Sequence, residues 1–334
     1  MTAGTGPGPS RRDFLKTAAA AVAGLSGGLA LGASLPGRAA VPPRAVIGIA
    51  TNVEVFDGQD RLIPQAVDAL LNRALAGALG APDGPRALAQ LFFPNDVVGI
   101  KINCLAGRGL STHAELVDAV IGQLVKAGVR TDNILVWDRS DRDLTRGRYK
   151  IRRSGAGPLY LGTNDEYENE PIDAGSVGGC LSRLLTHRMT ALINIPVVKD
   201  HDLAGISGAL KSFYGAIHNP NKYHDNACSP YIADLYAHPA IRSKARLTIF
   251  DGLMPQFQGG PAYVPDYAFK LGSIFVSTDP VAADAMALRI ITDRRNAAGL
   301  ESLGKAGRAP AWLHQAALLG LGTDDWSRIA EVKL

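Results

Sequence analysis

Residues 191–202 read Ala191-Leu-Ile-Asn-Ile-Pro-Val-Val-Lys-Asp-His-Asp202. The first eight are mostly apolar and rich in β-branched side chains, which is typical of a strand buried on both faces of a sheet. Four titratable side chains follow at once, from Lys199 to Asp202. Ligands of open α/β sheets bind at the carboxyl ends of the strands. The stretch therefore predicts a central strand and the sheet edge at which a site would lie.

Short apolar runs alternate with helical patterns on both sides of this stretch. Strands are expected over residues 46–51, 97–103, 134–137, 191–198, 247–250 and 273–276. Helices are expected over residues 62–79, from the capping box at 112–115 to near 128, and from the Asp279-Pro280 N-cap to about Ile291. This alternation predicts an α/β fold, a mostly parallel sheet with helices on both faces. The polar, Gly-rich residues 140–176 would mark the connection if the domain is split into two lobes.

The composition limits the class of protein. The chain has 334 residues, of which 46% are hydrophobic and 20% charged, so it can bury a large core and is not disordered as a whole. Its three cysteines, Cys104, Cys180 and Cys228, are far apart, with no C-x-x-C pair. The chain's own cysteines therefore cannot build a ferredoxin-type cluster or a zinc ribbon.

The first 40 residues have the pattern of a twin-arginine signal peptide. Ser10-Arg-Arg-Asp-Phe-Leu-Lys16 precedes an uncharged run over residues 18–35 and small residues that fit cleavage after Ala39 or Ala40. Glycines in the run weigh against the alternative, a membrane anchor. We expect an α/β domain of residues 41–334 in the periplasm or otherwise exported. The twin-arginine translocase would be its partner during export, and the leader its only membrane contact.

Removing the leader also removes most of the net charge. Four of the 35 basic residues and one of the 31 acidic residues lie in residues 1–40, which leaves 31 basic and 30 acidic residues. A nearly neutral domain does not indicate a nucleic-acid partner.

His201 is the candidate general acid–base. It stands between Asp200 and Asp202, and a carboxylate neighbour can fix the imidazole tautomer and hold its pKa near or above the usual value of about 6.5. Adjacent side chains on an extended chain point to opposite sides, so at most one aspartate is expected to face the ring. We predict His201, Asp202 and Lys211 as catalytic residues. A plain turn residue is the alternative for His201.

Lys211 lies ten residues beyond His201, among apolar neighbours. It can bind an anion as an ammonium ion, form a covalent bond if burial or a nearby cation lowers its pKa by about 3 units, or be an ordinary surface lysine. Gly208 permits close backbone approach to a ligand, and Lys199 adds a second cation. Lys211, Gly208 and Lys199 are therefore the candidate binding residues for a cofactor or a small anionic ligand.

A metal site is a further expectation. His218, His224 and Asp251 are its candidate ligands, which separate loops would have to bring together. The cofactor stays open between a nickel or iron ion and an organic group loaded before export. Ala209 replaces the last glycine of a nucleophile elbow, which disfavours a serine hydrolase, and there is no G-x-G-x-x-G or P-loop motif.

Several stretches resemble the family called domain of unknown function 362. They are Lys101-Ile-Asn-Cys104, Ile193-Asn-Ile-Pro-Val-Val-Lys-Asp-His201, Gly208-Ala-Leu-Lys-Ser-Phe-Tyr-Gly215, Asp251-Gly252, Gly259-Gly-Pro261 and Ser277-Thr-Asp-Pro-Val-Ala-Ala-Asp284. Many members of that family carry a segment with four-iron clusters, whose cysteines this chain lacks.

The order His201, Lys211, His224 is also similar to the nickel-dependent lactate racemase family. That resemblance implies an acid–base histidine, a lysine that tethers a nickel pincer nucleotide and a metal-binding histidine. Asp138-Arg139-Ser140 stand where the racemases have a second catalytic histidine.

Two classes of function follow from these residues. The first is an exported enzyme of proton-transfer or redox type, acting on a small anionic substrate such as a 2-hydroxy or 2-oxo acid. The second is a non-catalytic exported protein that binds a metal or a small ligand, or is the partner of a redox complex.

Overall fold

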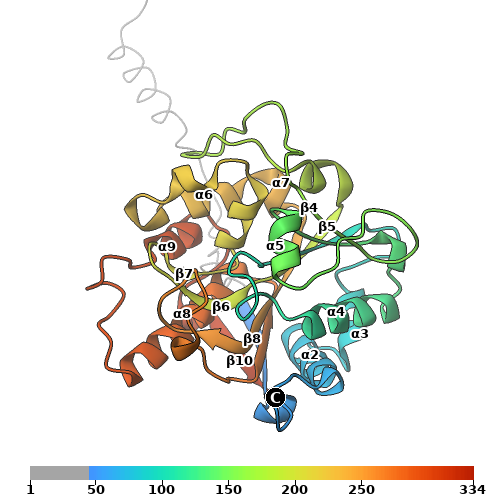
Figure 1. Cartoon of the computed structure of the whole chain (residues 1–334), viewed down its shortest axis with the longest axis horizontal. Helices are drawn as coiled ribbons and strands as arrows, with labels where there is room; N and C mark the ends of the chain where they lie inside the picture. The colour runs from blue at the N-terminus through green and yellow to red at the C-terminus, as the bar shows by residue number, and fades with distance from the viewer. Residues whose placement is uncertain (1–44) are drawn as a thin grey trace, which may run out of the picture. The chain divides into compact units, whose positions relative to one another are not determined.

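The computed structural model describes residues 45–334, which form a mixed ten-stranded sheet with helices around it (Figure 1). The expected leader, residues 1–40, lies outside the described residues. The strands are β1 Ala45–Thr51, β2 Val98–Ile102, β3 Ile134–Asp138, β4 Leu159–Gly162, β5 Ala191–Ile195, β6 Val197–His201, β7 Gly205–Ser207, β8 Ala245–Gln256, β9 Ser273–Ser277 and β10 Ile329–Lys333. The α-helices are α2 Pro64–Leu79, α3 Gly84–Ala89, α4 Ala114–Lys126, α5 Asp141–Arg146, α6 Tyr231–Ala237, α7 Pro239–Arg242, α8 Pro280–Ala297 and α9 Ala311–Leu318.

The sheet order confirms the α/β prediction. The strands lie in the order β10-β1-β9-β8-β5-β2-β3-β4, and β6 pairs with β7 and β8. Most of the strand pairs are parallel, including the run β8-β5-β2-β3-β4, whereas β9 is antiparallel to both its neighbours. The carboxyl ends of β2, β3 and β5 therefore meet at one edge, as the sequence predicts.

Apolar side chains fill both faces of the sheet. Phe250 and Phe275 stack with ring centroids 4.7 Å apart, in a core that includes residues of α6, α8 and α9. Their chain neighbours Ile249 and Val276 belong to the core shared with α2 and α4. This alternation follows from the two-residue period of a strand, and it explains why these strands are apolar throughout.

Three details correct the sequence predictions. The strand expected over residues 191–198 is two strands, because Pro196 has no N–H to donate to a ladder. The strands β4, β7 and β10 were not predicted, since β7 is three residues long and β10 is an edge strand with charged side chains. The capping box was wrong: His113 is the N-cap of α4, and the Thr112 hydroxyl instead donates to the carbonyl of Ile195.

The Asp279 N-cap is confirmed, because its carboxylate accepts from the N–H groups of Val281 and Ala282. Residues 140–176 contribute α5 and the edge strand β4 to the same sheet, and a division into two lobes stays a prediction. Within residues 45–334, no helix combines the length and the apolar character that crossing a bilayer requires.

Candidate functional site

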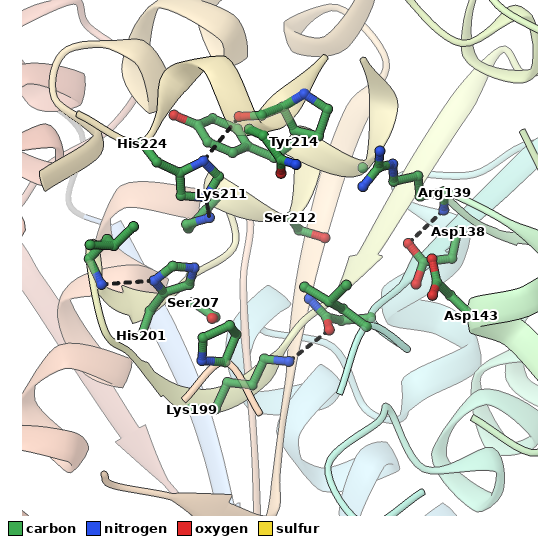
Figure 2. Close-up of a pocket in the computed structure, with 18 of the residues that line it drawn as sticks. Asp138, Arg139, Asp143, Lys199, His201, Ser207, Lys211, Ser212, Tyr214 and His224 are labelled. Atoms are coloured by element: carbon green, nitrogen blue, oxygen red, sulfur yellow. Dashed lines mark hydrogen bonds between the residues drawn. The ribbon is translucent and has the colours of Figure 1, made fainter. Parts of the chain in front are cut away.

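A hairpin after Pro196 places several predicted residues around one cavity. β6 pairs antiparallel with β7, with Lys199 opposite Ser207 and His201 opposite Gly205. The chain then enters a short 3₁₀ helix that begins at Lys211. Hairpin and helix line a cavity of about 440 Å³, and Figure 2 shows Lys199, His201 and Lys211 directed into it.

The opposite wall comes from the ends of two parallel strands. Lys101 lies near the end of β2 and Asn103 just after it, while Asp138 ends β3 and Arg139 follows. In Figure 2, Asp138 and Arg139 face Lys211 across the cavity. The site thus lies where the rule for α/β sheets expects it, between strand ends that are distant in sequence.

His201 is buried and uncharged. Burial and then the nearby Lys211 charge lower the pKa of His201 to about 2, which corrects the expectation of a value near or above 6.5. Its Nδ1 lies 3.0 Å from Asp202 Oδ1, and 3.2 and 3.3 Å from the amide nitrogens of Leu203 and Ala204. A proton on Nδ1 suits the carboxylate, and a proton on Nε2 suits the amides. Each tautomer of the uncharged ring therefore has a hydrogen-bonding neighbour at Nδ1.

Asp200 turns away from the imidazole, as the alternation along β6 predicts. Its carboxylate accepts from Arg308 Nη1 at 2.7 Å, and the same guanidinium donates to the carbonyl oxygen of His201 at 2.9 Å. Both side chains are buried. Arg308 therefore anchors the segment between α8 and α9 to the hairpin that carries His201.

Lys199 and Lys211 are buried amines without a carboxylate partner. Among residues 45–334, Lys199 Nζ donates to Asn103 Oδ1 at 2.8 Å, and Lys211 Nζ lies 3.2 Å from His224 Nε2. Neither nitrogen has a carboxylate oxygen within 4 Å in this part of the chain. Burial lowers the pKa of each to about 8. An anion entering the cavity would supply the countercharge that both lysines lack.

Lys101 contrasts with these two lysines. Its Nζ lies 2.8 Å from Asp138 Oδ1, and Lys101 and Asp138 are almost completely buried. Asp138 also accepts from the N–H groups of Cys104 and Arg139. The Lys101–Asp138 pair is thus a direct ion pair in the wall, whereas among residues 45–334 Lys199 and Lys211 contact an amide oxygen and an imidazole nitrogen instead of a carboxylate.

The three candidate metal ligands do not come together. His224 lies beside Lys211, whereas His218 Nδ1 accepts from the N–H of Cys180 and lines a neighbouring cavity. Asp251 is fully buried in β8 and pairs with His113 at 2.8 Å. Across residues 45–334, no group of three or more His, Cys, Asp or Glu side chains is arranged to hold a metal ion.

Gly208 lines the cavity, and its missing side chain also makes room for Asp284 of α8. A Cβ at residue 208 would overlap the carboxylate oxygens of Asp284. The Asp284 carboxylate accepts from the N–H groups of Ala209 and Leu210, and burial raises its pKa to about 7. Asp284 thereby fixes the backbone immediately before Lys211.

Sequence reasoning missed several lining residues. Lys101, Asn103, Asp138, Ser212 and Tyr214 all face the cavity. The first three lie at strand ends, and the last two lie in the polar stretch around Lys211, which are the signals that could have indicated them. Arg139, which follows β3, and Pro261, from the loop at residues 259–263, also line the cavity.

Comparisons with known proteins identify the family and leave the reaction open. No curated protein is significantly similar to the chain. A crystal structure of a structural genomics target from Thermotoga maritima matches with 12% identity and a TM-score of 0.46, covering 70% of this chain. The chain covers 59% of that protein, less than two thirds of its length.

Residues 98–289, more than half of the chain, match the family described as a domain of unknown function, DUF362. This range contains the hairpin, Lys211 and the strand ends that form the cavity. The chain therefore belongs to the DUF362 family.

Proposed function

We propose that this protein is an enzyme that binds a small carboxylate, of the 2-hydroxy or 2-oxo acid class, and moves a proton on it. The observation that carries the proposal is the cavity itself. It combines two buried lysines that lack carboxylate partners with an uncharged imidazole, His201. A cavity of about 440 Å³ holds a small acid.

The two lysines supply the binding energy for the carboxylate. Each lysine charge is desolvated in the free protein, so a substrate carboxylate removes an existing penalty when it binds. The ammonium of Lys199 is positioned by Asn103, and Lys211 approaches from the other side of His201. The carboxylate would thus be held beside the imidazole.

His201 performs the proton transfer. An uncharged imidazole can accept a proton from a carbon or hydroxyl of the bound acid, and Asp202 at 3.0 Å from Nδ1 stabilises the resulting imidazolium. Lys211 and Lys199 stabilise the negative charge that develops on the substrate. This is the division of roles expected from the sequence, with the pKa of His201 below the expected range.

Hydrogen exchange in deuterium oxide tests the proposal without knowledge of the product. A panel of 2-hydroxy and 2-oxo acids is incubated with the protein, and loss of the carbon-bound proton signal is followed by NMR. We expect exchange with at least one acid, and a decrease of about 100-fold or more in His201→Ala and Lys211→Ala. The exposed His314 provides the matched control, His314→Ala. Equal exchange by all four proteins would remove His201 and Lys211 from the mechanism.

A racemase-like version of the proposal places a nickel-bearing cofactor on Lys211 with His224 as a metal ligand. The 3.2 Å distance between Lys211 Nζ and His224 Nε2 supports their working together. The wall formed by β3 presents Asp138 and Arg139 and no second imidazole, so the residues fit this version only in part. Nickel and iron analysis and an ultraviolet–visible spectrum of the exported protein test it. The absence of both metal and chromophore would reject it.

We also propose that the protein acts after export by the twin-arginine translocase, a proposal that rests on residues 10–40. Replacing Arg11 and Arg12 by lysine should retain the protein in the cytoplasm, and unchanged export would refute the signal assignment.

The alternative function is non-catalytic binding of a small ligand or a redox partner. It predicts saturable binding of an acid without proton exchange.

A further inference from the structure

The side chain of His224 is oriented to accept a proton from Lys211. Its Nδ1 lies 3.0 Å from the carbonyl oxygen of Pro220, which can only accept a hydrogen bond, so Nδ1 carries the ring proton. Its Nε2 consequently presents a lone pair, and Lys211 Nζ lies 3.2 Å away and donates to it. A buried lysine usually contacts a carboxylate; here it contacts a neutral base.

Lys211 is also shielded from water and from carboxylates. It is 8% exposed, and its Nζ lies over the face of the Tyr214 ring, 4.4 Å from the ring centre. Within residues 45–334, the amine has no carboxylate within salt-bridge distance. Burial lowers its pKa to about 8, so about one molecule in ten carries the free amine at pH 7, far more than for an ordinary lysine.

We propose that Lys211 forms an imine with the carbonyl carbon of a bound 2-oxo acid, and that His224 is the base that removes the proton from the amine. This inference rests on the proposed function, and it narrows the substrate class from acids in general to 2-oxo acids. It makes Lys211 a nucleophile in place of the ammonium ion of the proposed function, and it leaves the substrate carboxylate to Lys199, whose amine is held by Asn103.

The reaction needs no oxidant, reductant or further reactant. The amine lone pair of Lys211 attacks carbon 2, forming a carbon–nitrogen bond while the carbonyl electron pair moves to oxygen. His224 Nε2 accepts one proton from the nitrogen and gives it to that oxygen, which becomes a hydroxyl group. His224 then carries the second nitrogen proton to the hydroxyl group in the same way, the carbon–oxygen bond breaks, water leaves, and the imine remains. The His201 ring lies 5.7 Å from the His224 ring, centroid to centroid, and is available for proton transfer at carbon 3.

Reductive trapping tests the inference directly. The full-length protein is incubated with pyruvate and cyanoborohydride, digested and analysed by mass spectrometry. We expect one carboxyethyl group on Lys211 and none on Lys222, an exposed lysine eleven residues further along that serves as an internal control. Lys211→Arg should give no adduct.

The role of His224 has its own readout. His224→Gln keeps a polar side chain but removes the base, so trapping at pH 7 should slow by about tenfold or more. Added imidazole should restore part of the rate, which a purely structural role would not allow. A rate equal to that of the wild type would refute the base assignment.

The outcomes separate this inference from the proposed function. Pyruvate binding measured by calorimetry without an adduct on Lys211, or with equal labelling of Lys222, overturns the imine and leaves the proposed function standing. Absence of both binding and adduct for all acids of the panel overturns both. An adduct on Lys211 alone supports both.

Discussion

Replacing Asp284 by asparagine should change the pH dependence of the protein's stability. The carboxylate of Asp284 is fully buried under the turn that leads to Lys211, and it accepts the N–H groups of Ala209 and Leu210 at 2.5 and 3.1 Å. Burial outweighs these two hydrogen bonds and raises the pKa of Asp284 to about 7 from 3.8. An asparagine side chain does not ionise, so the substitution removes the titration while keeping the size of the side chain.

The sign and size follow from proton linkage. A carboxyl group whose pKa is raised in the folded state contributes stability below pH 3.8, and this contribution is lost as pH rises to about 7. A difference of about 3 units corresponds to about 4 kcal/mol in the free energy of unfolding. The asparagine variant loses part of the hydrogen bonding to two backbone N–H groups at every pH, a roughly constant cost of about 1–3 kcal/mol.

Urea unfolding between pH 4 and pH 8 measures this difference. We expect the wild type to lose up to about 4 kcal/mol relative to Asp284→Asn over this range, so that the variant gains relative stability as pH rises. Asp293→Asn, the same substitution at an exposed position of α8, should follow the wild type at every pH. A wild-type-minus-variant difference that does not change with pH would contradict the raised pKa and the reasoning from burial.

Further predictions concern buried pairs and close contacts. Asp138→Ala leaves the buried Lys101 ammonium unpaired, and thermal or urea unfolding should show a loss of about 3–5 kcal/mol. Burial acts to lower the pKa of His113, but the Asp251 carboxylate outweighs burial and raises that pKa in the folded protein. The His113–Asp251 pair therefore stabilises the fold below about pH 6.5, and this stabilisation is lost as pH rises through the pKa of His113 in the folded protein. His113→Gln should therefore flatten that part of the pH–stability curve, and an unchanged curve would disprove the pairing. Gly260→Ala drives a methyl group into the main-chain carbonyl oxygen of Asp200 in β6, and a variant with unaltered melting temperature would disprove that contact.

The sequence contained the strong signals of the fold. Apolar, β-branched runs predicted the central strands, and the Asp279-Pro280 pair predicted the start of α8 correctly. Short-range patterns did not predict β7 or β10, because a three-residue strand and a partly charged edge strand are stabilised by their partners and not by their own periodicity.

Only part of the candidate site was predicted, because some of its residues are brought together by strand pairing and not by closeness in sequence. His201, Lys199 and Lys211 are close in sequence, and their density alone indicated a site. Lys101 and Asp138 come from two other strands, and the distance between their charged groups is set by the pairing of β2 with β3. The low pKa of His201 depends on burial, which a flanking aspartate in the sequence does not reveal.

The link between Arg308 and Asp200 has a practical consequence for any truncated form of this protein. The family match covers residues 98–289, so a fragment cut at its borders would omit Arg308, whose guanidinium binds Asp200 in β6 next to His201. It would also omit β1 and β10 at one side of the sheet. Such a fragment would leave Asp200 as a buried anion whose strongest partner is gone, and the fragment's inactivity would say nothing about the chemistry of the intact chain.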